Sequence, residues 1–271
     1  MRKAALVCCS DGLKPEQRPE IEQLKQILST MGVEPVESPR LYRGQTVFSG
    51  TAAQRAELLN GFFADPTIDA IFDVSGGDLA SELADFLDYS VIKASHARLW
   101  GYSDLTSLLN AIYAQTGREG VLWQARSMTW ACGENQQRDL QSGTLFTVPV
   151  EFLQGSEMEG VLVGGNIRCL LKLAGTPYFP DLTEKLLLLE SLSGSPARIN
   201  AYLSQLRQMG AFRKVRGIVL GTFTEMEQKK YSPSVEELLL AMTDKPVAKT
   251  KFIGHGPDAR AAVIGRTHRF P

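Results

Sequence analysis

The sequence predicts an α/β fold, because short apolar runs alternate with segments whose apolar residues repeat at helical spacing. Residues 4–9 and 68–74 are apolar enough for strands that are covered on both faces. Between these runs, residues 21–31 and 52–63 show the periodicity of helices. Repeated strand and helix units predict a mostly parallel sheet, and ligands collect beyond the carboxyl ends of such strands.

Two turns in the amino-terminal half fall at such strand ends. The Ser75-Gly76-Gly77 turn follows the second apolar run and leads into an expected helix over residues 78–87. A further strand is expected to end at Trp100, and residues 105–112 repeat apolar side chains at helical spacing. Both turns are therefore candidates for a ligand site.

The polar segment 133–142 has no apolar period, and it is the expected linker between two domains, residues 1–135 and 143–271. The second half mixes strands and helices less regularly than the first. Its expected strands lie at 186–189 and 218–220, and its expected helices follow Gly164-Gly165-Asn166, follow Ser195-Pro196 and cover 235–242.

Composition and charge narrow the class of partner. The chain has 29 Lys and Arg against 30 Asp and Glu, so no overall field attracts it to nucleic acid or anionic membranes. None of its four cysteines lies in a C-x-x-C pair, which favours a reducing compartment. The first apolar run is too short for an export signal, and no segment reaches the roughly 20 apolar residues of a membrane span. We expect a cytoplasmic protein without a nucleic-acid or membrane partner.

A candidate nucleophile lies in the turn Gly101-Tyr102-Ser103-Asp104, which ends a strand and begins a helix. A sharp turn of this kind holds a serine hydroxyl out of the sheet, and the following helix start favours developing negative charge. Leu105 occupies the place of the second glycine of the G-x-S-x-G pattern. Helix capping by Ser103 or Asp104 is the alternative interpretation.

His255 and Glu190 are the candidate partners of that serine. The chain has three histidines, and only His255 is flanked by glycines, which let the backbone bring the ring close to a partner. Glu190 directly follows four leucines, and a charge at the end of a buried strand needs a partner. A structural histidine in a turn and a solvent-facing carboxylate are the alternatives.

Backbone amides near these residues can bind an oxyanion. The Gly76-Gly77 turn can present free N–H groups, and the amide of Asp104 lies at the following helix start. A plain turn is the alternative for the glycine pair. The segment around the glycine pair lacks the third glycine of a dinucleotide-binding motif and the lysine of a phosphate-binding loop, so neither of these motifs is present there.

Taken in order, these segments resemble the LD-carboxypeptidase family of serine peptidases, which also includes the microcin C self-immunity peptidases. The similarity covers most of the chain. The matching segments are Ser49-Gly50-Thr51 with Arg55, Gly76-Gly77, Gly101-Tyr102-Ser103-Asp104, Gly164-Gly165-Asn166, Gly175-Thr176-Pro177, Leu189-Glu190, residues 217–221 and Gly254-His255-Gly256.

The resemblance implies a triad in which Ser103 is the nucleophile, His255 the general base and acid, and Glu190 the group that orients His255. It implies an oxyanion hole made of the Gly77 and Asp104 amides, and this chemistry needs no metal ion and no cofactor. It also implies an amino-terminal α/β domain, a smaller β-rich carboxy-terminal domain, a site between the two, and chains paired as homodimers.

The expected activity is hydrolysis of an amide bond through an acyl-enzyme, with a small peptide as substrate. The expected bond joins an L-centre to a terminal D-amino acid in a murein tetrapeptide, as in peptidoglycan recycling. One alternative is a peptidase for peptidyl or aminoacyl nucleotides, as in the microcin immunity branch. The other is a non-catalytic protein that binds a peptidoglycan fragment in the same cleft.

Two departures from the family pattern bear on the substrate. Many members carry Arg before the glycine pair and Tyr-Gly after it, whereas this chain has Ser75 before and Asp78-Leu79 after. We expect Asp78 to face the leaving group and to disfavour a free carboxylate unless a cation compensates its charge. The nearest candidate cations in the sequence are Arg55, Arg98 and Arg126.

Overall fold

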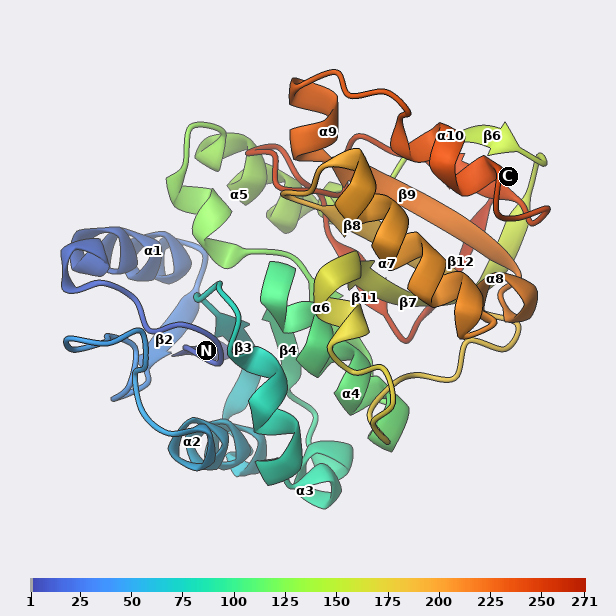
Figure 1. Cartoon of the computed structure of the whole chain (residues 1–271). Helices are drawn as coiled ribbons and strands as arrows, with labels where there is room; N and C mark the ends of the chain where they lie inside the picture. Colours follow the sequence, from blue (N-terminus) through green and yellow to red (C-terminus); the bar gives the residue numbers. More distant parts are fainter. Residues whose placement is uncertain (1) are drawn as a thin grey trace.

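The computed structural model describes residues 2–271 and confirms the α/β class, with a mostly parallel sheet in the first half. The strands form two six-stranded sheets, which Figure 1 shows with their covering helices. Across the described residues, no helix combines the length and the apolar character needed to cross a bilayer.

The helices and strands follow each other along the chain in this way. The first half contains the strands β1 (Arg2–Val7), β2 (Val33–Glu37), β3 (Ile68–Asp73), β4 (Arg98–Gly101) and β5 (Gly120–Leu122) and the helices α1 (Arg18–Thr30), α2 (Ala52–Ala64), α3 (Tyr89–Ala94), α4 (Thr106–Thr116) and α5 (Gly133–Ser142). Its short 3₁₀ helices are η1 (Pro15–Gln17), η2 (Ala80–Phe86), η3 (Ser103–Leu105), η4 (Ala125–Thr129) and η5 (Thr144–Phe146). The second half contains the strands β6 (Glu151–Gln154), β7 (Met158–Asn166), β8 (Leu186–Ser191), β9 (Gly217–Phe223), β10 (Val247–Lys249), β11 (Ala262–Ile264) and β12 (Thr267–Phe270) and the helices α6 (Ile167–Leu171), α7 (Pro196–Gln208), α8 (Ala211–Lys214), α9 (Thr224–Gln228) and α10 (Val235–Leu240).

The first sheet has the strand order β11-β5-β4-β3-β1-β2, and all of its neighbouring pairs are parallel except β11 and β5. Alternate residues of β1 enter different cores. Ala4 and Leu6 pack in the cluster that contains α1, whereas Ala5 and Val7 pack in the cluster that contains α2, α3 and α4. Both faces of the sheet are therefore covered, as its apolar strands predict.

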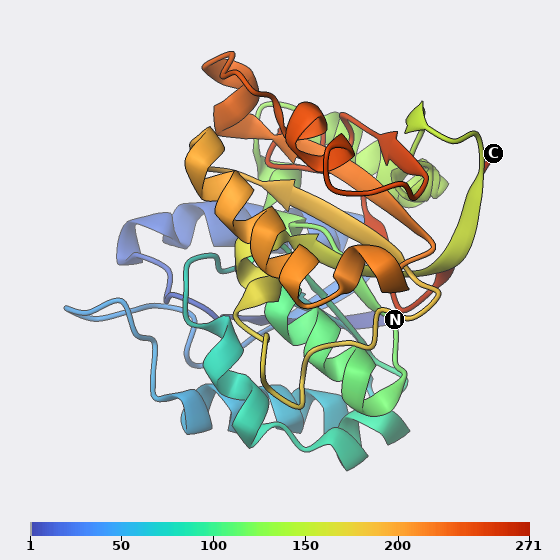
Figure 2. The ribbon, with the colours of Figure 1, turned by 45° about the vertical axis from the view of Figure 1, so that its right-hand side comes forward.

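The second sheet has the strand order β12-β7-β8-β9-β10-β6, with parallel strands in the centre and antiparallel strands at both edges. One face packs against the helices α6 to α10, and α7 and α8 lie across its outer side (Figure 1 and Figure 2). On the other face, Leu186 and Leu188 of β8 share a core with Leu105 and Leu108 of the first half. The two halves are thus packed into one continuous interior.

Two segments differ from their predicted structure. Residues 133–142, the expected linker, form the helix α5, so the predicted boundary at residue 135 falls inside a helix. The side chain of Gln136 is the buried one in this polar helix, and its Oε1 accepts a hydrogen bond of 2.9 Å from Trp123 Nε1. A polar contact of this kind produces no apolar period in the sequence. Within the expected helix 78–87, the structure has the 3₁₀ helix η2.

The four cysteines are free, and three of them, Cys8, Cys9 and Cys169, are buried. Burial raises the pKa of each of these thiols, to about 12 for Cys169. We expect a thiol-alkylating reagent at neutral pH to label the native protein at Cys132, and to reach the other three only after unfolding. Peptide mass spectrometry measures this, and rapid native labelling of Cys8 or Cys9 would contradict their inert, buried state.

Candidate active site

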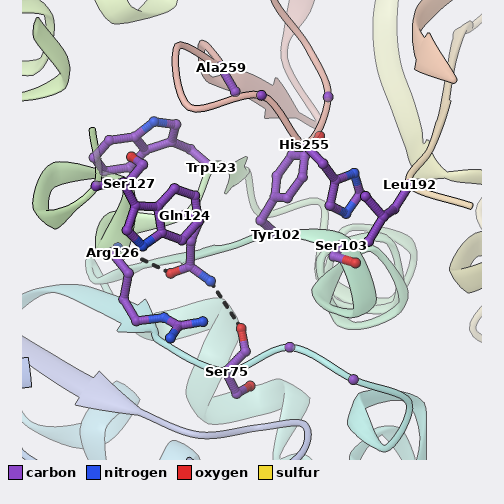
Figure 3. A pocket seen from close by; sticks show the side chains of 15 residues that line it. Ser75, Tyr102, Ser103, Trp123, Gln124, Arg126, Ser127, Leu192, His255 and Ala259 are labelled. Atoms are coloured by element: carbon purple, nitrogen blue, oxygen red, sulfur yellow. Dashed lines mark hydrogen bonds between the residues drawn. The ribbon is translucent and has the colours of Figure 1, made fainter. Parts of the chain in front are cut away.

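A cavity of about 250 Å³ lies at the carboxyl ends of β3 and β4, where the two halves of the chain meet. Its position agrees with the expectation for a parallel sheet. Figure 3 shows the side chains that surround it. The lining residues are Ser75, Gly76, Gly77, Tyr102, Ser103, Trp123, Gln124, Arg126, Ser127, Trp130, Leu192, Gly254, His255, Gly256 and Ala259.

Ser103 lies in a sharp turn between β4 and α4. Its φ of 55° is in the left-handed region, which is costly for a residue with a side chain and is maintained only where the surroundings require it. Gly101 permits this turn, because a Cβ at that position would overlap the side chain of Leu105. Neither Ser103 nor Asp104 caps the following helices η3 and α4 with its side chain, so the capping alternative does not describe this turn.

His255 and Glu190 form a close pair behind the serine. Nδ1 of His255 lies 2.9 Å from Oε2 of Glu190, whose carboxylate is completely buried at the end of β8. The two atoms are at ion-pair distance, although their alignment does not satisfy the angle of a hydrogen bond. The other carboxylate oxygen, Oε1, accepts a hydrogen bond of 2.9 Å from Asn166 Nδ2. The solvent-facing alternative for Glu190 is therefore excluded by its burial.

The ring of His255 is held from its other side by Tyr102. The two ring centroids lie 5.0 Å apart with an interplanar angle of 69°. Burial and the negative charge of Glu190 raise the pKa of the Tyr102 phenol well above its usual range, so that Tyr102 keeps its proton. His255 and Ser103 lie side by side at the cavity wall in Figure 3. The Nε2 of His255 has no protein partner among residues 2–271.

The helix after Ser103 is fixed to the second sheet by side-chain contacts with β7. Asn110 donates to the carbonyl of Gly164 and accepts from its N–H, at 2.9 and 2.8 Å. Thr106 Oγ1 accepts a hydrogen bond of 3.0 Å from the amide of Asn166. Because Asn166 is the register partner of Glu190 in the neighbouring strand, these contacts set the position of Ser103 relative to the carboxylate.

The Gly76-Gly77 turn is held by Asp11. The Asp11 amide donates to the carbonyl of Gly76 at 3.2 Å, and its Oδ1 accepts from the amide of Asp78 at 3.1 Å. Gly77 has a φ of 132°, and a Cβ at this position would overlap the Asp11 carboxylate. A residue without a side chain is therefore required at Gly77.

This difference between the two glycines gives a matched pair of variants. We expect Gly77→Ala to lower the free energy of unfolding by about 1–3 kcal/mol more than Gly76→Ala, because it combines strain with a clash. A Cβ at Gly76 meets no atom within 4 Å. Urea denaturation of both variants measures the difference, and equal destabilisation would show that Asp11 does not constrain the turn.

Asp104 is buried directly after the serine, and its carboxylate lies in a polar network and not in the cavity lining. It accepts hydrogen bonds of 2.7 Å from both Ser10 Oγ and the amide of Ala80. Lys172 Nζ, from the second half of the chain, lies 2.5 Å from the other carboxylate oxygen. These contacts hold the backbone of Asp104 and with it the amide that precedes α4. Within residues 2–271, no cluster of side chains has the composition of a metal site.

Residues 4–122 match the LD-carboxypeptidase N-terminal domain, and residues 159–270 match the LD-carboxypeptidase C-terminal domain. The chain belongs to the LD-carboxypeptidase family. Its two halves carry one of the family's domains each, and residues 123–158 between the matches contain η4, α5 and the connection to the second sheet.

This LD-carboxypeptidase family member is similar to several other proteins. A probable murein peptide carboxypeptidase of Bacillus subtilis is 28% identical over 235 residues, which cover 80% of this chain and 73% of the relative. The microcin C7 self-immunity protein MccF of Escherichia coli is 29% identical over 222 residues, which cover 66% of this chain and 63% of MccF. The crystal structure of an MccF-like protein from Bacillus anthracis has the same fold, with 23% identity, a TM-score of 0.89 and coverage of 99% of this chain and 92% of that chain.

Ser75 and Asp78, at which this LD-carboxypeptidase differs from the family pattern, have different surroundings in the structure. Ser75 lines the cavity, whereas Asp78 does not. The Asp78 carboxylate forms ion pairs with Arg168 and Lys172 of the second half, so its charge is compensated outside the cavity. Of the three candidate cations, Arg126 is the one that lines the cavity. The sequence patterns did not indicate that Tyr102, Trp123 and Trp130 line the cavity or that Asn166 contacts Glu190. Only the position of Asn166 at a strand end beside Glu190 could have indicated its contact.

Proposed function

We propose that this LD-carboxypeptidase family member is a serine peptidase in which Ser103, His255 and Glu190 form the catalytic triad. The observation that supports the triad most strongly is the buried Glu190 carboxylate, 2.9 Å from an imidazole that shares its cavity with Ser103. A buried carboxylate stabilises the imidazolium that forms when a histidine accepts the proton of a serine. The left-handed turn at Ser103 supports the same role, since it presents the hydroxyl at a strand end.

In the first half of the proposed reaction, Ser103 Oγ attacks the carbonyl carbon of the amide while His255 Nε2 accepts the hydroxyl proton. His255 then donates this proton to the leaving amine as the C–N bond breaks, and the acyl group remains on Ser103 as an ester. In the second half, water attacks the ester and gives a proton to His255, which returns it to Ser103 as the acid leaves. The amides of Gly77 and Asp104 stabilise the oxyanion in both tetrahedral intermediates.

The proposed substrate is a murein tetrapeptide, cleaved between an L-centre and a terminal D-amino acid. The Bacillus subtilis relative, named a probable murein peptide carboxypeptidase, supports this choice. The proposed setting is peptidoglycan recycling in the cytoplasm, by a homodimer. Light scattering of the purified protein would test the dimer, and a mass of one chain would contradict it.

A peptidyl or aminoacyl nucleotide is the second candidate substrate. It is favoured by Trp130, which lines the cavity and is 39% exposed, so its ring offers aromatic surface to a ligand. Aromatic side chains stack on nucleobases, and such stacking contributes about 1–3 kcal/mol per base. Assaying both substrates side by side distinguishes the two activities, because the same triad would serve both.

A fluorophosphonate probe, which forms a covalent bond with activated serines, tests the proposed mechanism. We expect the probe to modify the wild-type protein at Ser103 and to leave Ser127 unmodified, although both serines line the cavity. Ser127→Ala is the matched control and should retain labelling, whereas Ser103→Ala should lose it. Absence of labelling in wild type, combined with binding of a murein peptide, would support a non-catalytic binding protein instead.

A further inference from the structure

We propose that Arg126 binds the terminal carboxylate of the substrate and thereby makes the cavity prefer a free acid to the corresponding carboxamide. This inference rests on the proposed function, because it specifies the substrate class of the same cavity. Arg126 would act through binding and would take no part in the proton transfers. It is a specificity-determining residue and lies in the segment between the two matched family domains.

The charge of the cavity singles out Arg126. Among the lining residues within the described chain, Arg126 is the one with a permanent charge, and His255 is the other one that can be charged. Among residues 2–271 no carboxylate lines the cavity, and the ion-pair partner of Arg126, Glu20 at 3.2 Å, lies outside the lining. The nearby Asp78 does not oppose such an anion, because Arg168 and Lys172 pair with it outside the cavity.

The guanidinium of Arg126 contains nitrogen atoms that have no hydrogen-bond acceptor among residues 2–271. Its Nη1 donates to Glu20 Oε2 at 3.2 Å, and the side chain is 15% exposed. Its Nε is buried and has no acceptor among residues 2–271. The other nitrogen, Nη2, has no acceptor in this part of the chain either. An arginine guanidinium can bind a carboxylate through two parallel hydrogen bonds. This binding needs N–H donors that are not already used within the protein.

Glu20 and Gln124 hold Arg126 in the cavity wall. Glu20 accepts hydrogen bonds from Arg126, from Thr129 Oγ1 at 3.2 Å and from Trp130 Nε1 at 3.0 Å. Gln124 accepts from the amide of Arg126 at 3.3 Å and donates to the carbonyl of Ser75 at 3.0 Å. Figure 3 shows the guanidinium beside Ser75, on the wall opposite Ser103 and His255. The cation thus lies beside Ser75, and these hydrogen bonds hold it in place before a ligand arrives.

The test compares a D-alanine-terminated murein tetrapeptide with its carboxamide, which has the same shape and no terminal charge. Binding is measured in the Ser103→Ala background, where no turnover depletes the ligand, through the fluorescence of Trp123 and Trp130. We expect Arg126→Gln to weaken binding of the free acid by about 10- to 100-fold, the loss of a hydrogen bond to a charged group. Binding of the carboxamide should change less than 3-fold, and Arg126→Lys should restore part of the loss.

Arg98→Gln is the matched control, because Arg98 also forms a partly exposed ion pair, with Glu119 at 3.0 Å, but does not line the cavity. It should leave binding of both probes unchanged. Thermal unfolding of every variant separates a binding loss from a folding loss. Equal losses for acid and carboxamide in Arg126→Gln, or no binding of the free acid before the substitution, would overturn the assignment of Arg126. The proposed peptidase mechanism fails independently, through absence of probe labelling at Ser103.

Discussion

Ser103→Ala is expected to reduce kcat by about 10⁴- to 10⁶-fold, because the acyl-enzyme cannot form without the hydroxyl. The fold should persist, since the Ser103 hydroxyl makes no hydrogen bond with residues 2–271 and no buried volume is lost. Steady-state hydrolysis of the tetrapeptide measures the loss, and circular dichroism and thermal unfolding check the fold. Substantial residual hydrolysis by a pure Ser103→Ala protein would rule out the serine mechanism.

The backbone at Ser103 supplies a second variant with a different expected outcome. Because φ is 55° there, Ser103→Gly should be as inactive as Ser103→Ala, yet more stable than it by about 1 kcal/mol. Urea denaturation of the two inactive proteins measures this difference. If alanine and glycine proved equally stable, the strain assigned to the turn would be absent.

Glu190→Gln is expected to reduce kcat by about 10⁴-fold while leaving the shape of the site intact. Glutamine can fill the same buried space, but it carries no charge to stabilise the imidazolium of His255. Its amide can also favour the wrong tautomer of the ring, because the group 2.9 Å from Nδ1 can then be a donor. Hydrolysis assays and thermal unfolding should show a catalytic loss without unfolding.

Glu159→Gln is the control for Glu190→Gln, because Glu159 is an exposed carboxylate that forms an ion pair of 3.8 Å with Arg269. This control should retain wild-type kcat. A Glu190→Gln enzyme with more than about a tenth of the wild-type kcat would remove Glu190 from the triad and leave it a buried structural group.

Local sequence patterns predicted the parts of the site that depend on the backbone. Gly101 before Ser103 and Gly254 before His255 are small because a Cβ would overlap Leu105 in one case and Thr222 in the other. Glu190 follows a leucine run because β8 is buried along its whole length. Each of these features leaves a trace in neighbouring residues. The sequence therefore pointed to Ser103 and His255, which line one cavity, and to Glu190, which is buried 2.9 Å from His255.

Contacts between distant residues left no such trace. Asp78 and Arg168 are 90 residues apart, and no local pattern shows that they pair. The charge of Asp78 was therefore expected to face the substrate, and the structure shows it compensated by cations outside the cavity. The helix α5 is a similar case. Gln136 of α5 accepts a hydrogen bond from Trp123, and residues 133–142 by themselves cannot reveal this contact.

The path of the chain near its carboxyl end has a mechanical consequence. The chain leaves the first sheet through residues 147–150, returns to it with β11 beside β5, and crosses back to the second sheet with β12. The chain therefore passes between the two sheets three times, so rotation about a single hinge is not available to the two halves. We expect a substrate to enter past Trp130 and Leu192, the exposed apolar side chains of the cavity lining.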